Sequence, residues 1–295
     1  MRCQALSPIM THMRVAFLGL GRMGRELVAH LLSNDDYQVV VWNRTPEKAA
    51  SCLAKGAELA KTPGDAVRDA PLVITCLFGP QAARDVVLDT ALPWAAGACW
   101  VDTSTVGPQF ARTCAEWACA HGVSYVQAPV LGSLGPARAG QLGVLIGSPD
   151  ARARALARSV SSLWADADRI VEYDEAGKAA AGKLLVNYGL AVGMQSLVEA
   201  CQVGEAGGLT LEEAVALAKL PKTPLSVIAG MKGDALMSGD YSDTQFSANL
   251  LAKDVHLMLD TASDQKLPAL EVASEALDRA CQMGHGEDDF SALAG

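Results

Sequence analysis

The chain has 295 residues, a formal net charge of −9, and a composition that is 50% hydrophobic but only 5% aromatic. The acidic balance argues against nucleic acid or an anionic membrane as the main partner, and no apolar run reaches the about 18 residues of a membrane span. The length suits two domains or one large one, with a core built mostly from Ala, Val and Leu.

Eight cysteines occur at irregular spacings without a C-x-x-C pair, and the five histidines fall at no metal-ligand spacing to them. This pattern favours a reduced, cytoplasmic protein over one held by disulfides, and it predicts no metal site. Residues 1–12 lack the apolar segment of a secretory signal. We expect them to form a disordered leader, with Met10 and Met13 as alternative starts.

The first predicted element is a buried strand at residues 14–18, followed by Gly19, Gly21 and Gly24 and then by apolar residues at helical spacing. A strand, a G-x-G-x-x-G turn and a helix form the context of a dinucleotide fingerprint; the alternative is a glycine-rich turn without function. The glycines allow a tight turn, a close approach to pyrophosphate and close helix packing, and the helix N-terminus attracts phosphate. The predicted cofactor residues are Gly19, Leu20, Gly21, Arg22, Met23 and Gly24.

The second predicted strand, residues 38–42, ends at Asn43-Arg44-Thr45. An NAD-preferring domain usually has an acidic residue here to bind the ribose 2′-hydroxyl. Asn and Thr can instead bond a phosphate without repelling it, and the guanidinium can fork onto it. We therefore predict NADP(H) as the cofactor; the alternative is an exposed polar turn before the helix that opens at Pro46.

Two further strands, residues 72–77 and 99–102, end where ligands bind in open α/β sheets. Leu77 and Phe78 at the first end are predicted to contact the cofactor. Ser104 and Thr105 follow the second end and precede a predicted helix at residues 108–120. Their hydroxyls suit an anionic group of cofactor or substrate, and the alternative is a plain N-cap by Thr105.

The remaining pattern divides the chain near residue 175. Strands are predicted at 125–130, 142–146 and 169–173, a helix at 149–163, and a glycine-rich loop without helix or strand at 131–140. Helices alone are predicted afterwards, at 177–205, 211–220, 224–237, 250–263 and 269–282. We predict an α/β chain with a Rossmann-type NADP-binding domain at 13–174 and an all-helical substrate and dimerisation domain at 175–295, joined by the long helix.

The long helix carries Lys183 and Asn187, four residues apart and hence on one face. A partly buried lysine beside an amide can hold a proton for a carbonyl oxygen, because desolvation makes its charge mobile. The alternative is an ordinary surface lysine. Gly182, Gly189 and Gly193 in the same helix offer a close contact, either with a second copy or within the chain.

In order and spacing, several segments resemble those of the β-hydroxyacid dehydrogenase family, which includes 3-hydroxyisobutyrate dehydrogenases and glyoxylate/succinic semialdehyde reductases. The segments are residues 19–24, 102–105 with Pro108, 128–130 with Gly132, Gly140 and Leu142, 177–187, and Lys253-Asp254 after Phe246. They cover nearly the whole chain. The Asn43-Arg44-Thr45 turn and residues 288–291 are most similar to the glyoxylate/succinic semialdehyde reductase branch, which uses NADPH.

The resemblance implies a role for each matching position. Lys183 would be the general acid in reduction and the general base in oxidation, and Asn187 would help to hold the substrate oxygen. The implied substrate contacts are Ser104, Thr105, Gly132, Ser133, Phe246 and Asp254, and the implied cofactor contacts at the nicotinamide end are Thr105 and Lys253. The family also implies a homodimer or tetramer.

Leu131 departs from the family pattern, which usually has serine after Pro-Val. An isobutyl group replaces a carboxylate-binding hydroxyl, so a longer or less polar carbonyl compound becomes more plausible than glyoxylate. We expect an NADPH-dependent reductase of a small aldehyde, semialdehyde or 3-oxo acid. The alternatives are an imine reductase, which Leu131 favours and Lys183 disfavours, and a non-catalytic cofactor-binding protein.

Overall fold

The computed structural model describes residues 12–295, so the predicted leader lies almost wholly outside the described residues. The chain forms two compact units. Residues up to Ser104 together with Phe110–Ala179 make the first, and Thr105–Gln109 together with Ala180–Gly295 make the second. The division falls after the first turn of the long helix α8 (Ala176–Ala206).

The first unit is built on a nine-stranded sheet in the order β3-β2-β1-β4-β5-β6-β8-β7, with β9 paired to β8. Neighbours from β3 to β6 run parallel, and β8 is antiparallel to β6 and β7. The strands are β1 (Met13–Leu18), β2 (Tyr37–Trp42), β3 (Glu58–Leu59), β4 (Leu72–Thr75), β5 (Cys99–Asp102), β6 (Ser124–Gln127), β7 (Val130–Leu131), β8 (Leu142–Gly147) and β9 (Ala165–Tyr173). The order β3-β2-β1-β4-β5-β6 is that of a dinucleotide-binding sheet, which confirms the predicted fold class.

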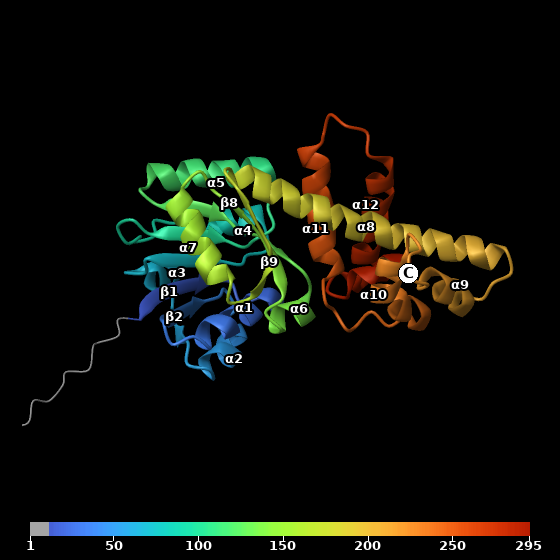
Figure 1. Ribbon diagram of the computed structural model, residues 1–295, viewed down its shortest axis with the longest axis horizontal. Coiled ribbons are helices and arrows are strands. Elements are labelled where there is room, and N and C mark those ends of the chain that lie inside the picture. The colour runs from blue at the N-terminus through green and yellow to red at the C-terminus, as the bar shows by residue number, and fades with distance from the viewer. Residues whose placement is uncertain (1–11) are drawn as a thin grey trace, which may run out of the picture. The chain divides into compact units, whose positions relative to one another are not determined.

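Both faces of this sheet are covered, as the continuous apolar strands require. Along β1, Val15 and Phe17 belong to one buried cluster while Ala16 and Leu18 belong to another. The helices of this unit are α1 (Arg22–Leu32), α2 (Ala50–Leu53), α3 (Pro63–Val67), α4 (Pro80–Ala83), α5 (Pro108–Ala120), α6 (Leu134–Arg138) and α7 (Ala151–Ser161). Helices α1 and α7 pack on the first face and α3 on the second (Figure 1).

The prediction that residues 131–140 form a loop without helix or strand was wrong. Ser133 occupies an extended N-cap position, and α6 makes one short helical turn behind it. Glycine content lowers helix propensity, but Arg138 pairs with Glu26 of α1 at 3.0 Å and secures the turn. The predicted strand 125–130 is likewise interrupted before Val130, since Pro129 has no amide hydrogen for a ladder bond.

The second unit contains only helices, turns and one isolated bridge among its described residues, which confirms the predicted helical region. Its elements are α8 (Ala176–Ala206), α9 (Leu211–Ala218), α10 (Ser226–Ser238), α11 (Ala248–Thr261), α12 (Pro268–Ala280), a π-helical turn (Cys281–His285) and a 3₁₀ turn (Phe290–Ala294). Helices α11 and α12 lie side by side, and both contribute to one core with α8 (Figure 1).

Helix α8 has two different sides. Leu184, Met194 and Leu197 pack into the core of the unit, whereas Leu185 is 74% exposed. Gly193 faces Ile228 of α10, but a side chain at Gly189 would meet nothing within 4 Å. By length and composition this helix is apolar enough to cross a membrane. Its core side nevertheless packs as in a globular helical domain, so the exposed side is what needs explanation.

Candidate functional site

The glycine turn after β1 has the geometry that a dinucleotide needs. Gly19 has φ +107°, and a β-carbon there would lie 2.3 Å from the carbonyl oxygen of Cys76; one at Gly24 would lie 2.2 Å from the carbonyl oxygen of Gly19. At Gly21 the space is open. No side chain caps the N-terminus of α1, which leaves this helix end available for an anion. The turn therefore fits a pyrophosphate held by backbone N–H groups.

Asn43 has a more local role than the sequence suggested. Its Oδ1 accepts a hydrogen bond from the Leu20 amide at 2.8 Å, and its Nδ2 donates to the Thr45 carbonyl at 2.8 Å. The side chain thus ties the glycine turn to the turn after β2. Arg44 and Thr45 are exposed beside it and remain the groups available to a 2′-phosphate.

Ser104 is 2% exposed, which the sequence did not indicate. Its Oγ accepts a hydrogen bond from the Leu77 amide at 2.9 Å, so it joins the segments that follow β4 and β5. Phe78, next along the chain, is 56% exposed. Ser104 therefore supports the predicted cofactor segment from behind, while Phe78 is accessible to a ligand.

Beneath this segment lies a buried polar network that sequence reasoning missed. The carboxylate of Asp102 accepts hydrogen bonds from Thr75 Oγ1 at 2.7 Å and from the Ser104 amide at 3.0 Å, and the indole of Trp100 donates to Thr75 Oγ1 at 2.9 Å. Burial raises the pKa of Asp102, and the hydrogen bonds from Ser104 and Thr75 oppose that rise. The sequence did contain a signal for this network, because Asp102 is a charged residue at the end of the otherwise apolar strand β5.

The predicted substrate loop is fixed to the cofactor helix. Gly132 has φ +133°, and a β-carbon there would lie 2.9 Å from Leu142. Leu131 is partly buried and covers Gly143 of the adjacent strand. A ring nitrogen of His30 on α1 lies 2.7 Å from the Ala137 carbonyl, in addition to the Glu26–Arg138 ion pair. Leu131, Gly132 and Ser133 are thus presented by a braced turn.

The second unit brings together five of the predicted site residues. Asn187 Nδ2 donates to Asp254 Oδ2 at 2.5 Å, and both side chains are buried. Lys253 Nζ lies 2.6 Å from Asp254 Oδ1 and donates to the Thr105 carbonyl at 3.0 Å. Lys183 stands one helical turn before Asn187, on the same face of α8. The cluster joins α8 to α11 through charged hydrogen bonds.

The electrostatics of this cluster make Lys183 a proton-transfer candidate. Burial lowers the pKa of Lys183 from 10.5 to about 8, while the charge of Asp254 opposes this shift and that of Lys253 adds to it. A group with a pKa near the working pH can both hold and release a proton. The alternative of an ordinary surface lysine therefore loses support, and Lys178 shows the contrast, since it pairs with Asp174 on the exposed surface.

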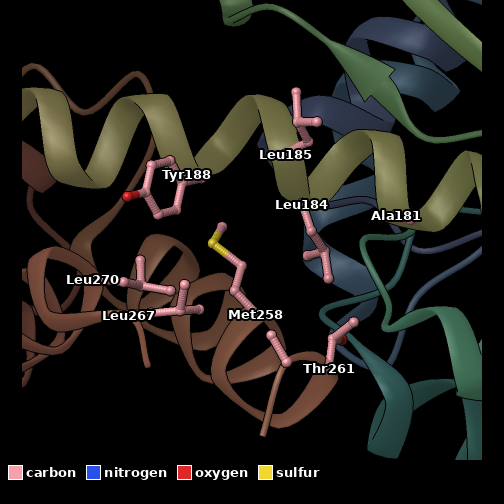
Figure 2. A pocket seen from close by; sticks show the side chains of 9 residues that line it. Ala181, Leu184, Leu185, Tyr188, Met258, Thr261, Leu267 and Leu270 are labelled. Atoms are coloured by element: carbon pink, nitrogen blue, oxygen red, sulfur yellow. The ribbon is translucent and has the colours of Figure 1, made fainter. Parts of the chain in front are cut away.

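An apolar pocket of about 270 Å³ lies elsewhere in the second unit (Figure 2). Leu184 and Tyr188 extend from α8 toward α11, and Met258 extends from α11 toward Tyr188. Its lining residues are Ala181, Leu184, Leu185, Tyr188, Met258, Thr261, Ala262, Leu267 and Leu270. Neither Lys183 nor Asn187 is among them, so this pocket is not the proton-transfer cluster.

Two family models together match almost all of the described chain. Residues 14–170 match the NAD-binding domain of 6-phosphogluconate dehydrogenase, and residues 177–295 match the NAD-binding domain of NADP-dependent 3-hydroxyisobutyrate dehydrogenase. The chain belongs to the 3-hydroxyisobutyrate dehydrogenase-like family. Both family models are described as NAD-binding, and the dehydrogenases of this family are NAD(P)-dependent, so a nicotinamide dinucleotide is the cofactor that the glycine turn fits.

Curated relatives divide into two kinds. Glyoxylate/succinic semialdehyde reductase 1 of Arabidopsis thaliana is 29% identical over 95% of this chain and 97% of its own length. The cytokine-like nuclear factor N-PAC of Anopheles gambiae is 27% identical over 96% of this chain but only 50% of its own length. The chain thus spans about half the length of the N-PAC relatives that it matches.

Solved structures agree with the family. A 3-hydroxyisobutyrate dehydrogenase of Mycobacterium tuberculosis with L-serine has a TM-score of 0.83 and 26% identity, covering 96% of this chain and 98% of that one. Psf3 in complex with NADP+ and 2-OPP has a TM-score of 0.82 and 26% identity, covering 95% and 98%. An imine reductase from Pseudomonas sp. is more distant, with a TM-score of 0.62, 23% identity and coverage of 95% and 97%, and shares the fold.

Proposed function

We propose that this chain is an NADPH-dependent reductase that converts a small aldehyde, semialdehyde or 3-oxo acid into the hydroxy acid. The observation that carries the proposal is Lys183, a partly buried lysine with a pKa of about 8 beside the Asn187–Asp254 pair. An ordinary surface lysine keeps its ammonium group in water and does not lie beside a buried amide–carboxylate pair. Membership of a β-hydroxyacid dehydrogenase family supports the same reaction class.

Lys183 acts as the acid of the reduction. The bound nicotinamide supplies the hydride equivalent. As negative charge grows on the carbonyl oxygen, Lys183 gives that oxygen a proton, which it holds at neutral pH because its pKa is about 8. Asn187 and Asp254 hold the part of α8 that carries Lys183 against the middle of α11 through their 2.5 Å hydrogen bond. In the reverse direction neutral Lys183 takes the proton back.

NADPH is the preferred cofactor in this proposal. The turn after β2 carries no acidic residue before Pro46, and Arg44 and Thr45 are exposed there. Asn43 holds this turn against the glycine turn, so Arg44 has a fixed backbone from which to reach a 2′-phosphate. The structure of Psf3 in complex with NADP+ is consistent with this preference.

Leu131 shapes the choice of substrate. Its side chain stands where the family usually has a carboxylate-binding serine, whereas Gly132 and Ser133 keep a backbone N–H and a hydroxyl for an anion. We therefore favour a carbonyl compound with an apolar segment between its carbonyl and its acid group over glyoxylate. Leu131 is also the observation that favours a second candidate, reduction of a cyclic imine, in line with the fold shared with imine reductases.

We further propose a homodimer in the cytoplasm, with a second copy covering the exposed side of α8. Leu185 is 74% and Val186 41% exposed, Gly189 leaves room for close approach, and the apolar pocket adjoins the same side. A contiguous apolar surface of this kind marks a protein–protein contact. The free thiols among the described cysteines suit a reducing compartment.

The test is oxidation of reduced cofactor, followed by absorbance, with NADPH and NADH against glyoxylate, succinic semialdehyde and methylmalonate semialdehyde. Faster oxidation of NADPH with one of the semialdehydes supports the proposal. Turnover of a cyclic imine without turnover of any semialdehyde would transfer the assignment to imine reduction. Tight NADPH binding without turnover of any carbonyl compound would indicate a cofactor-binding protein without catalysis.

A further inference from the structure

A buried ion pair in the second unit lies outside the proton-transfer cluster. Lys232 on α10 and Asp289 near the end of the chain are 2.8 Å apart, and their side chains are only 8% and 3% exposed. Lys232 Nζ also lies 4.7 Å from the centre of the Phe290 ring. Desolvating two charges is costly, so such a pair persists only where further hydrogen bonds compensate for the lost water.

Asp289 has those further bonds, and they reach a second segment of the chain. Its Oδ2 accepts hydrogen bonds from the amides of Gln245 at 3.1 Å and Phe246 at 3.4 Å. Its Oδ1 accepts from both the amide and the hydroxyl of Ser291. One carboxylate therefore joins α10, the segment that contains Phe246, and the end of the chain.

Residues 286–294, here named the C-terminal strap, also hold the start of α11 by backbone bonds. The Phe290 amide donates to the Phe246 carbonyl at 2.9 Å, and the amides of Ala248 and Asn249 donate to the carbonyls of Asp288 and Gly286, each at 2.9 Å. Ser247 at the N-cap makes no side-chain capping bond. The strap thus satisfies the first N–H groups of α11, which a cap residue would otherwise serve.

The strap lies directly on α11. A β-carbon at Gly286 would come within 2.5–2.7 Å of the Asn249 side chain, so a larger residue there would displace the Asn249 amide group. The rings of Phe246 and Phe290 meet edge to face with centres 6.2 Å apart. About one and a half turns further along α11 stand Lys253 and Asp254 of the proton-transfer cluster.

We propose that Lys232 and Asp289 are positioning residues of the second unit. Their ion pair fastens the C-terminal strap, and the strap fixes both Phe246 and the register of α11 that places Asp254 against Asn187. The kinetic consequence rests on the proposed reductase function, whereas the anchoring of residues 245–249 does not. The two parts can therefore be tested separately.

The test compares Asp289→Asn and Lys232→Met with a matched pair of control variants. The controls are Asp234→Asn and Lys219→Met, because Lys219 and Asp234 form a 2.6 Å ion pair that also involves α10 but is exposed, 84% at Asp234. Lys232→Arg, which keeps the charge, serves as the rescue variant. Hydrogen exchange is followed at the amides of residues 245–249, and steady-state kinetics are normalised to the number of NADPH-binding sites.

We expect amide exchange at residues 245–249 to accelerate at least about tenfold in both test variants and to be unchanged in the controls. The KM for the carbonyl substrate should rise and kcat should fall, for a combined loss of at least about tenfold in kcat/KM. The Kd for NADPH should change less than kcat/KM, because the glycine turn belongs to the other unit and only Lys253 of the expected cofactor contacts lies on α11. Lys232→Arg should recover part of the loss.

Two results would overturn the proposal. Unchanged exchange at residues 245–249 would mean that the ion pair does not fasten the strap. Faster exchange with wild-type KM and kcat per binding site would mean that the strap has only a structural role. If the wild-type protein turns over no carbonyl compound or imine, the proposed function fails instead, and the exchange comparison alone decides whether the pair anchors the strap.

Discussion

The two units present their functional groups in different ways. In the first unit the cofactor turn works through backbone: Gly19, Gly21 and Gly24 leave room, and a helix N-terminus supplies the N–H groups. In the second unit the proposed chemistry would depend on desolvated side-chain charges, with Lys183 beside Asp254 and Lys253. Backbone recognition needs open space and fixed N–H groups, whereas a shifted pKa depends on the charges of neighbouring side chains. Substitutions should therefore affect binding in the first unit and the rate of chemistry in the second.

The largest effect should come from Lys183→Ala. Loss of the general acid is expected to lower kcat for reduction about 10²–10⁴-fold while the Kd for NADPH changes little. Lys178→Ala is the matched control, since Lys178 lies on the same helix in an exposed ion pair with Asp174. Stopped-flow and steady-state rates decide the point, and near wild-type turnover by Lys183→Ala would disprove the assignment.

Arg44→Ala tests the first unit. Removal of a charge-assisted bond to the 2′-phosphate should lower kcat/KM for NADPH about 10- to 150-fold and leave that for NADH nearly unchanged. Lys55→Ala, an exposed charge beyond the same turn, serves as control. An equal loss of kcat/KM with NADPH and NADH would show that Arg44 does not bind the 2′-phosphate.

Asp254→Asn should shift the pH profile of kcat in both directions of the reaction. In the wild type, reduction needs protonated Lys183, so its kcat should fall as pH rises through about 8, and oxidation should rise over the same range. Asp254 raises the pKa of Lys183, so removal of its charge should shift both midpoints to lower pH, by about one unit. Midpoints that do not move would exclude electrostatic coupling between these residues.

The smallest change is expected from Leu131→Ser in the substrate loop. A hydroxyl at this position should raise kcat/KM for glyoxylate several-fold, about tenfold at most, and lower it for longer semialdehydes. Leu131→Ala separates the two causes, because it opens the pocket without adding a hydroxyl. Equal gains in both variants would point to space rather than to hydrogen bonding.

Much of the first unit follows from local sequence. The fingerprint at residues 19–24 and the apolar strand 99–102 are short-range patterns, and each forms the predicted element; the strand predicted at 72–77 also forms but ends at Thr75. The paired spacing of Lys183 and Asn187 predicts their common face for the same reason. Each of these depends on residues that are close in the chain, which is what pattern reading can detect.

The features that could not be predicted from the sequence depend on contacts between residues far apart in the chain. Ser104 is withdrawn from the surface by a bond to Leu77, and Asn43 is occupied by Leu20 and Thr45. Lys232 and Asp289 are 57 positions apart and carry no spacing signal. The short helix α6 forms despite its glycine because Leu134 and Ala137 are buried and because His30 and Glu26 of α1 contact Ala137 and Arg138. Each of these features is determined by tertiary contacts and not by the local secondary-structure propensity of the sequence.

The indole of Trp100, which bonds Thr75 in the buried network, has a practical consequence for any study of folding. The rings of Trp94 and Trp117 lie 6.1 and 6.2 Å from it, and all tryptophans of the chain fall in the first unit, namely Trp42, Trp94, Trp100, Trp117 and Trp164. Tryptophan emission, excited at a wavelength that tyrosine does not absorb, therefore reports on the first unit alone. A fluorescence melting curve should remain unchanged while the helical unit unfolds, and circular dichroism in the far ultraviolet should detect that loss.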